Sequence, residues 1–349
     1  MSLKIQTAIE TIKNLYLNDN QLSFLLLGAT GIGKSENVNK LAKDLNLPII
    51  EFDLSIVEPV DLLGLPVSRD NSFEYLPIKV LYNNIISRPG ILFLDELTNV
   101  QRTDVLSAAL RIVLDRKIGI HKLHPKTLII AAGNRLEDSS LVSELPVPLI
   151  NRFVVLEIEK PNPKDWIQYM SENYEEWDKS IAAFLSKFPN YIHYVPSNIT
   201  QTLSQVATPR TWTQLALISK EIEDDLHVLE EVASGLVGKE AASHFITFRN
   251  TKLPDEEDLR KDFKGVWSKT SIAAKYMLAV QFRDRPIKDV LWFMDNLADI
   301  PDHEILVLLF TIVPNKNKQI LITTIIKKRP NLRSILVNTF RELSKFIEG

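Results

Sequence analysis

The segment Gly28–Ser35, with the sequence GATGIGKS, has the residue types and the spacing that cradle a phosphate group. Its glycines let successive backbone N–H groups point into one concavity, because no Cβ restricts their backbone angles or their approach to a ligand. Lys34 would reach the β- and γ-phosphates of a nucleotide, and the Ser35 hydroxyl would be a ligand of the bridging Mg2+. The residues predicted to contact the nucleotide in this loop are Gly28, Ala29, Thr30, Gly31, Ile32, Gly33, Lys34 and Ser35.

The flanks of this loop fit the same interpretation. The apolar run Phe24–Leu27 before it predicts a buried strand, and Glu36–Leu45 after it predicts a helix whose positive N-terminal end adds to phosphate binding. The alternative is a glycine-rich turn that matches the pattern by chance. The intact spacing and the flanks favour the phosphate loop.

Polar residues follow two further predicted strands. Ile91–Glu96 is an apolar run that ends in Asp95 and Glu96, and Asn134 comes just after the strand predicted at 127–132. In an open α/β sheet the carboxyl ends of the strands form the ligand crevice, so these side chains should face the phosphates. The alternatives are an acid pair that caps a helix and, for Asn134, an ordinary turn residue.

Composition limits the class of protein. The 349 residues are 45% apolar and 24% charged with a net charge of −3, which is typical of a soluble protein of about two domains. The absence of cysteine excludes disulfides, thiolate metal sites and cysteine nucleophiles. The N-terminal 17 residues predict an amphipathic helix and no signal peptide, and no run of 18 uncharged apolar residues indicates a membrane span, so we expect a cytoplasmic protein.

Strand and helix patterns alternate from the loop to about residue 160. This predicts an α/β sheet with flanking helices, interrupted by hairpins near 64–78, within the second helix, and near 118–126. Pro161 and Pro163 mark a boundary. We therefore expect an α/β nucleotide-binding domain over 1–160, a helical lid over 161–250 and a C-terminal helical domain over 251–349.

Beyond the boundary only helices are expected. Their apolar stripes are interpreted as core. The predicted helices are Trp166–Lys187, Thr211–Asp225, Val228–Ile246, Glu256–Trp267, Ile272–Phe282, Lys288–Leu297, His303–Val313, Gln319–Lys328 and Asn331–Ile347.

Taken in order, five motifs resemble those of an AAA+ ATPase. They are Gly28–Ser35, Ile91–Glu96, Ala131–Asn134, Asn151–Phe153 and Thr208–Arg210. The two hairpins and the sequences at 61–66 (DLLGLP) and 94–98 (LDELT) are similar to MoxR-like members of that family. The resemblance extends to about residue 217, and residues 250–349 contribute nothing to it.

The resemblance implies a P-loop NTPase fold, ATP and Mg2+ as cofactors, and a role for each motif residue. Asp95 would bind the nucleotide and hold Mg2+ with Ser35, and Glu96 would polarise the attacking water. Asn134 would act as sensor 1. Arg152 would be the arginine finger that reaches the neighbouring subunit's nucleotide, and Arg210 would be sensor 2, which couples the lid to the nucleotide.

Each role implied for an arginine has an alternative. Arg152 could pair with Glu144 or Glu157, and Arg210, which opens a predicted helix after a proline, could form a surface salt bridge. Arg102 is a possible second trans-acting arginine, but a solvated side chain is preferred there. The long segment at 186–205 departs from a tight lid connection and puts sensor 2 in doubt.

The resemblance implies an ATP hydrolase that forms a ring, with a hexamer expected, and remodels a protein client in a chaperone-like way. A client or partner with a von Willebrand factor A domain is implied by the MoxR-like features. The alternative is a nucleic-acid motor or nucleotide-gated subunit of a restriction or phage system, which the slightly acidic composition does not favour. Nothing in the sequence suggests a nucleotide-binding module that has lost turnover, since all the catalytic positions are filled. A preference for GTP in place of ATP stays open.

Overall fold

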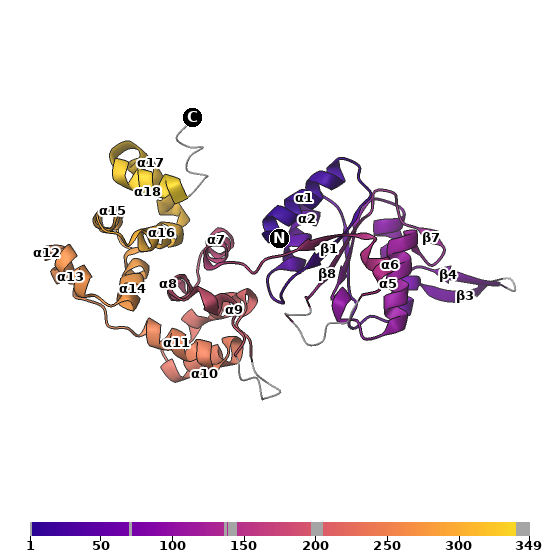
Figure 1. Cartoon of the computed structure of the whole chain (residues 1–349), viewed down its shortest axis with the longest axis horizontal. Helices are drawn as coiled ribbons and strands as arrows, with labels where there is room; N and C mark the ends of the chain where they lie inside the picture. The colour runs from indigo at the N-terminus through magenta and orange to yellow at the C-terminus, as the bar shows by residue number, and fades with distance from the viewer. Residues whose placement is uncertain (1, 70–71, 136–137, 139–144, 197–204, 340–349) are drawn as a thin grey trace. The chain divides into compact units, whose positions relative to one another are not determined.

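A computed structural model describes residues 2–69, 72–135, 138, 145–196 and 205–339 of the chain. The chain divides into two compact units, residues 1–160 and 161–349. Figure 1 shows a sheet with helices in the first unit and helices in the second. Within the described ranges, no helix is long and apolar enough to cross a membrane.

The first unit is built on a parallel five-stranded sheet in the order β2-β5-β8-β1-β9. In the three central strands every residue is buried except the last of β1 and of β5, as expected for a parallel sheet covered by helices on both faces. Leu25 pairs with Ala131 of β8 on one side and Val155 of β9 on the other. The strands are β1 Ser23–Leu27, β2 Ile49–Asp53, β5 Ile91–Asp95, β8 Leu128–Gly133 and β9 Phe153–Glu157.

Helices cover both faces of this sheet (Figure 1). Along β1, Phe24 and Leu26 pack with the helices α1 (Ile5–Leu17) and α2 (Lys34–Asp44), whereas Leu25 faces the cluster that contains α5 (Thr103–Asp115). Alternate side chains of a strand point to opposite faces, so each strand contributes to two cores. Full burial of one such side chain contributes about 1.5–3 kcal/mol.

Two antiparallel hairpins extend from the sheet domain at the positions predicted for them. The first, β3 (Leu65–Arg69) with β4 (Ser72–Leu76), lies between short helical pieces; the second pairs β6 (Lys117–Ile118) with β7 (His121–Lys122). The helical segment that follows the first hairpin is α4, continued by a π-helical turn. The remaining helical segments of this unit are α3 (Pro59–Leu63), α4 (Lys79–Leu81), η1 (Tyr82–Ile86), η2 (Leu97–Asn99) and α6 (Val147–Ile150).

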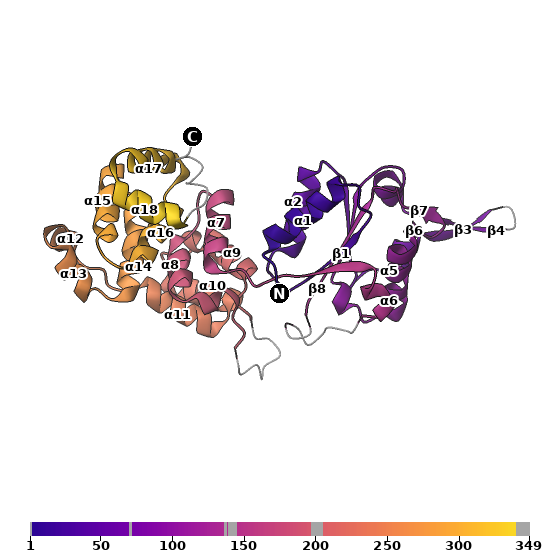
Figure 2. The same ribbon diagram turned by 45° about the horizontal axis from the view of Figure 1, so that its top comes forward.

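The second unit is helical in all of its described elements, apart from a single bridge between Tyr194 and Ala207. A continuous apolar core joins the helices, and in Figure 2 α10 and α11 lie side by side. The elements are α7 Pro163–Asn173, α8 Lys179–Lys187, η3 Pro189–His193, α9 Pro209–Ile218, η4 Ser219–Glu221, α10 Leu226–Val237, α11 Lys239–Arg249, α12 Glu256–Lys261, α13 Phe263–Lys269, α14 Ile272–Phe282, α15 Ile287–Ala298, α16 His303–Ile312, α17 Asn315–Lys328 and α18 Pro330–Thr339.

Two helices predicted as continuous are each broken by an aspartate. The prediction of one helix over 166–187 is wrong because Asp178 caps a new helix, its Oδ1 accepting from the Ser180 N–H at 2.9 Å. The prediction over 256–267 is wrong because Asp262 caps α13, its Oδ1 accepting from the Gly265 N–H at 2.9 Å. A side chain that satisfies unpaired helix N–H groups competes with helix continuation.

Two further helix predictions are wrong, one because the helix is interrupted and the other because it ends early. The helix predicted over 228–246 is interrupted at Gly238, whose φ of 85° is a left-handed value that ends α10. The helix predicted over 211–225 ends at Ile218 and continues only as a 3-10 turn, because Asp225 is already the cap of the next helix. For the helix predicted over 331–347, the part beyond residue 339 lies outside the described residues.

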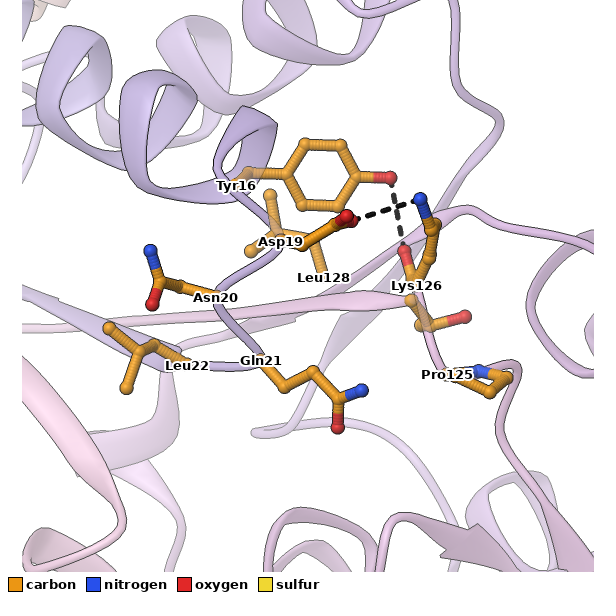
Figure 3. A pocket seen from close by; sticks show the side chains of 9 residues that line it. Tyr16, Asp19, Asn20, Gln21, Leu22, Pro125, Lys126 and Leu128 are labelled. Carbon is orange, nitrogen blue, oxygen red and sulfur yellow. Dashed lines mark hydrogen bonds and ion pairs between the residues drawn. The ribbon is translucent and has the colours of Figure 1, made fainter.

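A cavity of about 170 Å3 lies at the sheet edge where β1 and β8 begin. Figure 3 shows Tyr16 and Asp19 beside Lys126: the tyrosine Oη donates to the Lys126 carbonyl oxygen at 3.1 Å, and the Asp19 carboxylate pairs with the Lys126 ammonium at 2.9 Å. The phosphate loop follows the opposite end of β1, so this cavity is separate from the predicted site.

Candidate functional site

The loop between β1 and α2 has the backbone that its glycines predict. Gly33 has a φ of 87°, a left-handed value that favours glycine, and forms the N-terminal cap of α2. A Cβ at Gly28 would lie 2.8 Å from the Ile32 Cδ1 atom and 3.0 Å from the Ile158 carbonyl oxygen. The loop therefore needs glycine at one position for conformation and at the other for close packing.

Lys34 is the centre of the polar cluster. Its ammonium group donates to the carbonyl oxygens of Gly28 at 2.7 Å and Ala29 at 3.0 Å, and to the Asn134 Oδ1 at 3.2 Å. Only 8% of the residue is exposed. Burial lowers the pKa of Lys34 to about 8, although the nearby carboxylates of Glu96 and Asp95 act in the opposite direction.

Ser35 and Asp95 lie against each other across the start of α2 and the end of β5. The Ser35 hydroxyl donates to the Asp95 Oδ2 at 2.5 Å, and the Asp95 Oδ1 accepts from the Glu96 N–H at 2.9 Å. A hydroxyl and a carboxylate are oxygen ligands of the kind that Mg2+ takes in nucleotide sites. The two predicted metal ligands are thus in contact and chemically suitable.

Glu96 departs from the predicted strand, which ends one residue earlier. Its φ of 56° is left-handed, an uncommon conformation for a residue with a Cβ and one that costs about 1–3 kcal/mol. The Glu96 Oε2 accepts from the Asn134 Nδ2 at 3.3 Å and also from the Asn99 Nδ2. The backbone turn thus directs the carboxylate towards Asn134.

Asn134 connects the loop to Glu96. Its Oδ1 accepts from Lys34 and from the Thr30 hydroxyl, the latter at 3.1 Å, while its Nδ2 donates to Glu96. Its backbone N–H donates to the Thr98 Oγ1 at 2.7 Å, and its side chain is buried. Because both ends of the amide are engaged, the orientation of the oxygen and the nitrogen is fixed by the bonds they make.

Thr98 and Asn99, which sequence reasoning missed, belong to the same site. They lie in the 3-10 turn η2 directly after Glu96, and they hold Asn134 and Glu96 respectively. Their only signal in the sequence is that two polar residues follow the acidic end of a strand. Short polar side chains are common in turns, so that signal is weak.

The two predicted arginines do not join this cluster by any bond among the described residues. Arg152 is exposed in the turn between α6 and β9, and no ion pair with Glu157 is found within the described ranges; its other alternative partner, Glu144, lies outside them. Arg210 is exposed in the first turn of α9, in the second unit. Arg102 pairs with Glu58 at 2.7 Å, as expected for a solvated side chain.

Comparison with known proteins bears on this geometry. The family model described as the AAA domain (dynein-related subfamily) matches residues 23–153. The Holliday junction branch migration motor RuvB of Thermotoga maritima is 18% identical, with 73% of this chain and 72% of that chain covered and a TM-score of 0.41. NtrX from Brucella abortus is 13% identical, with 71% and 68% covered and a TM-score of 0.35.

These structural likenesses are too distant to support an argument, and no curated protein matches the chain. The family match does support an assignment, because it spans the loop, the acidic strand end at Asp95 and the strand that leads to Asn134. The five-stranded parallel sheet has these groups at its carboxyl edge. Residues 23–153 therefore form an AAA+ ATPase domain with a P-loop fold.

Proposed function

We propose that this protein binds ATP with Mg2+ and hydrolyses the bond between its β- and γ-phosphates. The observation that supports this is the hydrogen-bonded cluster of Lys34, Ser35, Asp95, Glu96 and Asn134 at the carboxyl edge of the sheet. These groups come from the first turn of α2 and from the ends of β5 and β8. Phosphoryl transfer needs mainly positioning and positive charge around the phosphates, which such a cluster supplies.

The loop would hold the triphosphate. Its backbone N–H groups and the N-terminal end of α2 would bind the phosphate oxygens, and Lys34 would exchange its bonds to the loop carbonyls for bonds to the β- and γ-phosphates. Ser35 and Asp95 would hold Mg2+, which when bound neutralises phosphate charge. ATP is proposed over GTP on the resemblance of the motifs to AAA+ ATPases.

Glu96 would orient the attacking water and take its proton. Its carboxylate would accept a hydrogen bond from the water while the Asn134 amide donates to the water or to the γ-phosphate. Both side chains are held on neighbouring strand ends, so the spacing between them is set by the sheet. A positioned general base typically contributes about 100- to 10,000-fold to the rate.

Completion of the site would require a second copy of the chain. Arg152 is exposed, and the described residues offer its guanidinium no ion pair, so it is available to reach the γ-phosphate bound by a neighbour. An arginine supplied in this way raises turnover by about 1,000- to 100,000-fold in related nucleotide hydrolases. We propose a ring, with a hexamer expected, in which Arg210 couples the helical lid to the nucleotide.

The work done by this ring would be remodelling of a protein client, as in MoxR-like ATPases, with a von Willebrand factor A domain protein as the implied partner. The exposed apolar residues Leu65, Tyr75 and Ile120 on and beside the two hairpins suit contact with protein. A nucleic-acid partner has less support. The basic residues at the end of α17 near residue 328 would have to bind it, and the neighbouring Arg329 already pairs with Asp295 at 2.8 Å.

The test is the substitution Glu96→Gln, with ATP turnover, nucleotide affinity and assembly measured on the same preparation. We expect turnover to fall about 100-fold or more, with affinity and assembly retained, because the amide keeps the size of the carboxylate but not its basicity. The control Glu51→Gln changes an exposed carboxylate on β2 and should leave turnover unchanged. Undiminished turnover in Glu96→Gln would overturn the proposed mechanism.

A further inference from the structure

The 3-10 turn Leu97–Asn99, here called the positioning turn, carries two consecutive polar side chains that hold the two proposed catalytic groups. Asn99 donates from Nδ2 to the Glu96 Oε2 and from its backbone N–H to the Glu96 carbonyl oxygen at 2.9 Å. Thr98 accepts the Asn134 N–H at 2.7 Å. One turn of chain therefore binds the end of β5 to the end of β8.

Asn99 has a feature that packing does not explain. Its Oδ1 is buried and has no hydrogen-bond partner in the described part of the chain. A buried polar atom without a partner is destabilising, and such atoms in native proteins need a specific reason. The Nδ2 of this amide donates to Glu96, whereas its Oδ1 has no partner among the described residues. This indicates that the role of the Asn99 side chain is its bond to the Glu96 carboxylate.

Thr98 packs tightly against the end of β8. A Cβ at Gly133 would lie 2.6 Å from both the Oγ1 and the Cγ2 of Thr98. The hydroxyl therefore sits directly against the end of β8, where it fixes the backbone from which the Asn134 side chain projects. The exposed fraction of Thr98 is only 4%, so its hydroxyl is shielded from competing water.

The two side-chain amides that donate to Glu96 differ in their other hydrogen bonds. Asn134 is also bonded to Lys34 and Thr30 of the phosphate loop, whereas among the described residues the side chain of Asn99 bonds to Glu96 alone. Asn134 must therefore respond to whatever the loop binds. Asn99 can hold the carboxylate independently of the loop.

From this arrangement we infer that the positioning turn is a specific part of the hydrolytic site: Asn99 is a positioning residue for Glu96, and Thr98 is one for Asn134. The inference rests on the proposed ATP hydrolysis. The Asn99 donor fixes the direction of the Glu96 carboxylate, so that the carboxylate stays aimed at the site. Thr98 acts only on position, because it does not touch the carboxylate.

The experiment compares Asn99→Asp and Thr98→Val in full-length protein, with kcat and KM for ATP measured at one pH. Both substitutions keep the size of the side chain. In Asn99→Asp we expect kcat to fall roughly 10- to 100-fold with KM changed less than about threefold. In the Glu96→Gln background the same substitution should cause no further loss of kcat, because the carboxylate that Asn99 positions is already gone.

Thr98→Val should lower kcat by about 10-fold through the unsatisfied Asn134 N–H, with KM changed less than about threefold. The control Asn84→Ala removes a half-buried amide that bonds the Val80 carbonyl oxygen and Arg88, outside the site. It should match the natural protein.

The outcomes separate this inference from the proposed function. If Asn99→Asp keeps kcat within about twofold, or lowers kcat further in the Glu96→Gln background, while Glu96→Gln alone loses turnover, the inference is overturned and ATP hydrolysis stands. If the natural protein does not turn over ATP, or Glu96→Gln equals it, both are overturned. Should Asn99→Asp fail to fold, Asn99→Ser removes the amide without adding charge, and the same fall in kcat is expected of it.

Discussion

The lowered pKa of Lys34 makes nucleotide binding depend on pH in a measurable way. Burial lowers the pKa of Lys34 from 10.5 to about 8. Only the protonated ammonium attracts phosphate, and phosphate oxygens beside it favour the protonated form. Binding near pH 8 should therefore take up protons from solution, and affinity should fall as the pH rises through 8.

The size of the effect follows from that value. With a pKa of about 8, about half of the Lys34 side chains are protonated at pH 8 and about one in eleven at pH 9. If phosphate contact keeps the bound Lys34 protonated throughout this range, binding at pH 8 takes up about 0.5 proton. The Kd for nucleotide should then rise about eightfold between pH 7.5 and pH 9.

Isothermal titration calorimetry with a non-hydrolysable ATP analogue and Mg2+ measures the uptake directly. The titration is repeated at pH 8 in two buffers of different ionisation enthalpy, and the difference in heat gives the number of protons. Lys34→Arg is the matched variant, because a guanidinium stays protonated across this range and should take up none. Lys179→Met is a second control, since the pKa of Lys179 is also lowered by burial, to about 7, but the residue lies in the other unit.

Three results would refute the reasoning. Binding by the natural protein without proton uptake at pH 8 would show that the charge of Lys34 does not change on binding. An equal uptake in Lys34→Arg would assign the protons to another group. A Kd that stays constant from pH 7.5 to 9 would contradict the assignment of Lys34 to the phosphates.

Two further substitutions test the loop and the ring. Gly33→Ala places a Cβ on a left-handed residue, which costs about 1–2 kcal/mol, so the Kd for the ATP analogue should rise roughly 10-fold; Gly235→Ala, in a helix with open space around it, should leave the Kd unchanged. Arg152→Ala should lower turnover about 1,000-fold with little change in affinity, and mixing it with Glu96→Gln should restore part of the activity, because each chain supplies the group that the other lacks. The control Arg102→Ala should keep full turnover. Mixtures no more active than their components would argue against a shared site.

The sequence alone could predict which residues lie together where local spacing or the ends of strands decide their neighbours. Lys34 and Ser35 follow the loop directly. Asp95 ends one strand and Asn134 follows another, and the carboxyl ends of neighbouring strands meet at one edge of a parallel sheet. The fold class, with its parallel sheet followed by helices, was predictable for the same reason. Periodicity alone could describe these strands because their apolar runs are short and bounded by turns.

Other features depend on contacts that spacing does not encode. Thr98 and Asn134 are 36 positions apart, and their bond exists only because β5 and β8 are adjacent. The left-handed backbone of Glu96 could not be predicted from the sequence, because glutamate seldom adopts that conformation. Helix breaks at Asp178 and Asp262 were missed because apolar periodicity continues across them while a capping bond decides the chain direction.

The Asn134 amide explains why one cluster can link phosphate binding to the water-polarising group. The amide is planar and rigid, with Lys34 and Thr30 on its oxygen and Glu96 on its nitrogen. A phosphate that draws the Lys34 ammonium away from the Oδ1 removes one of the bonds that fix the amide, and any rotation of the amide moves the donor that Glu96 accepts. The Glu96 carboxylate would then depend more on Asn99, whose bond does not involve the loop. Loss of the Asn99 donor should therefore impair turnover at saturating nucleotide more than it impairs binding.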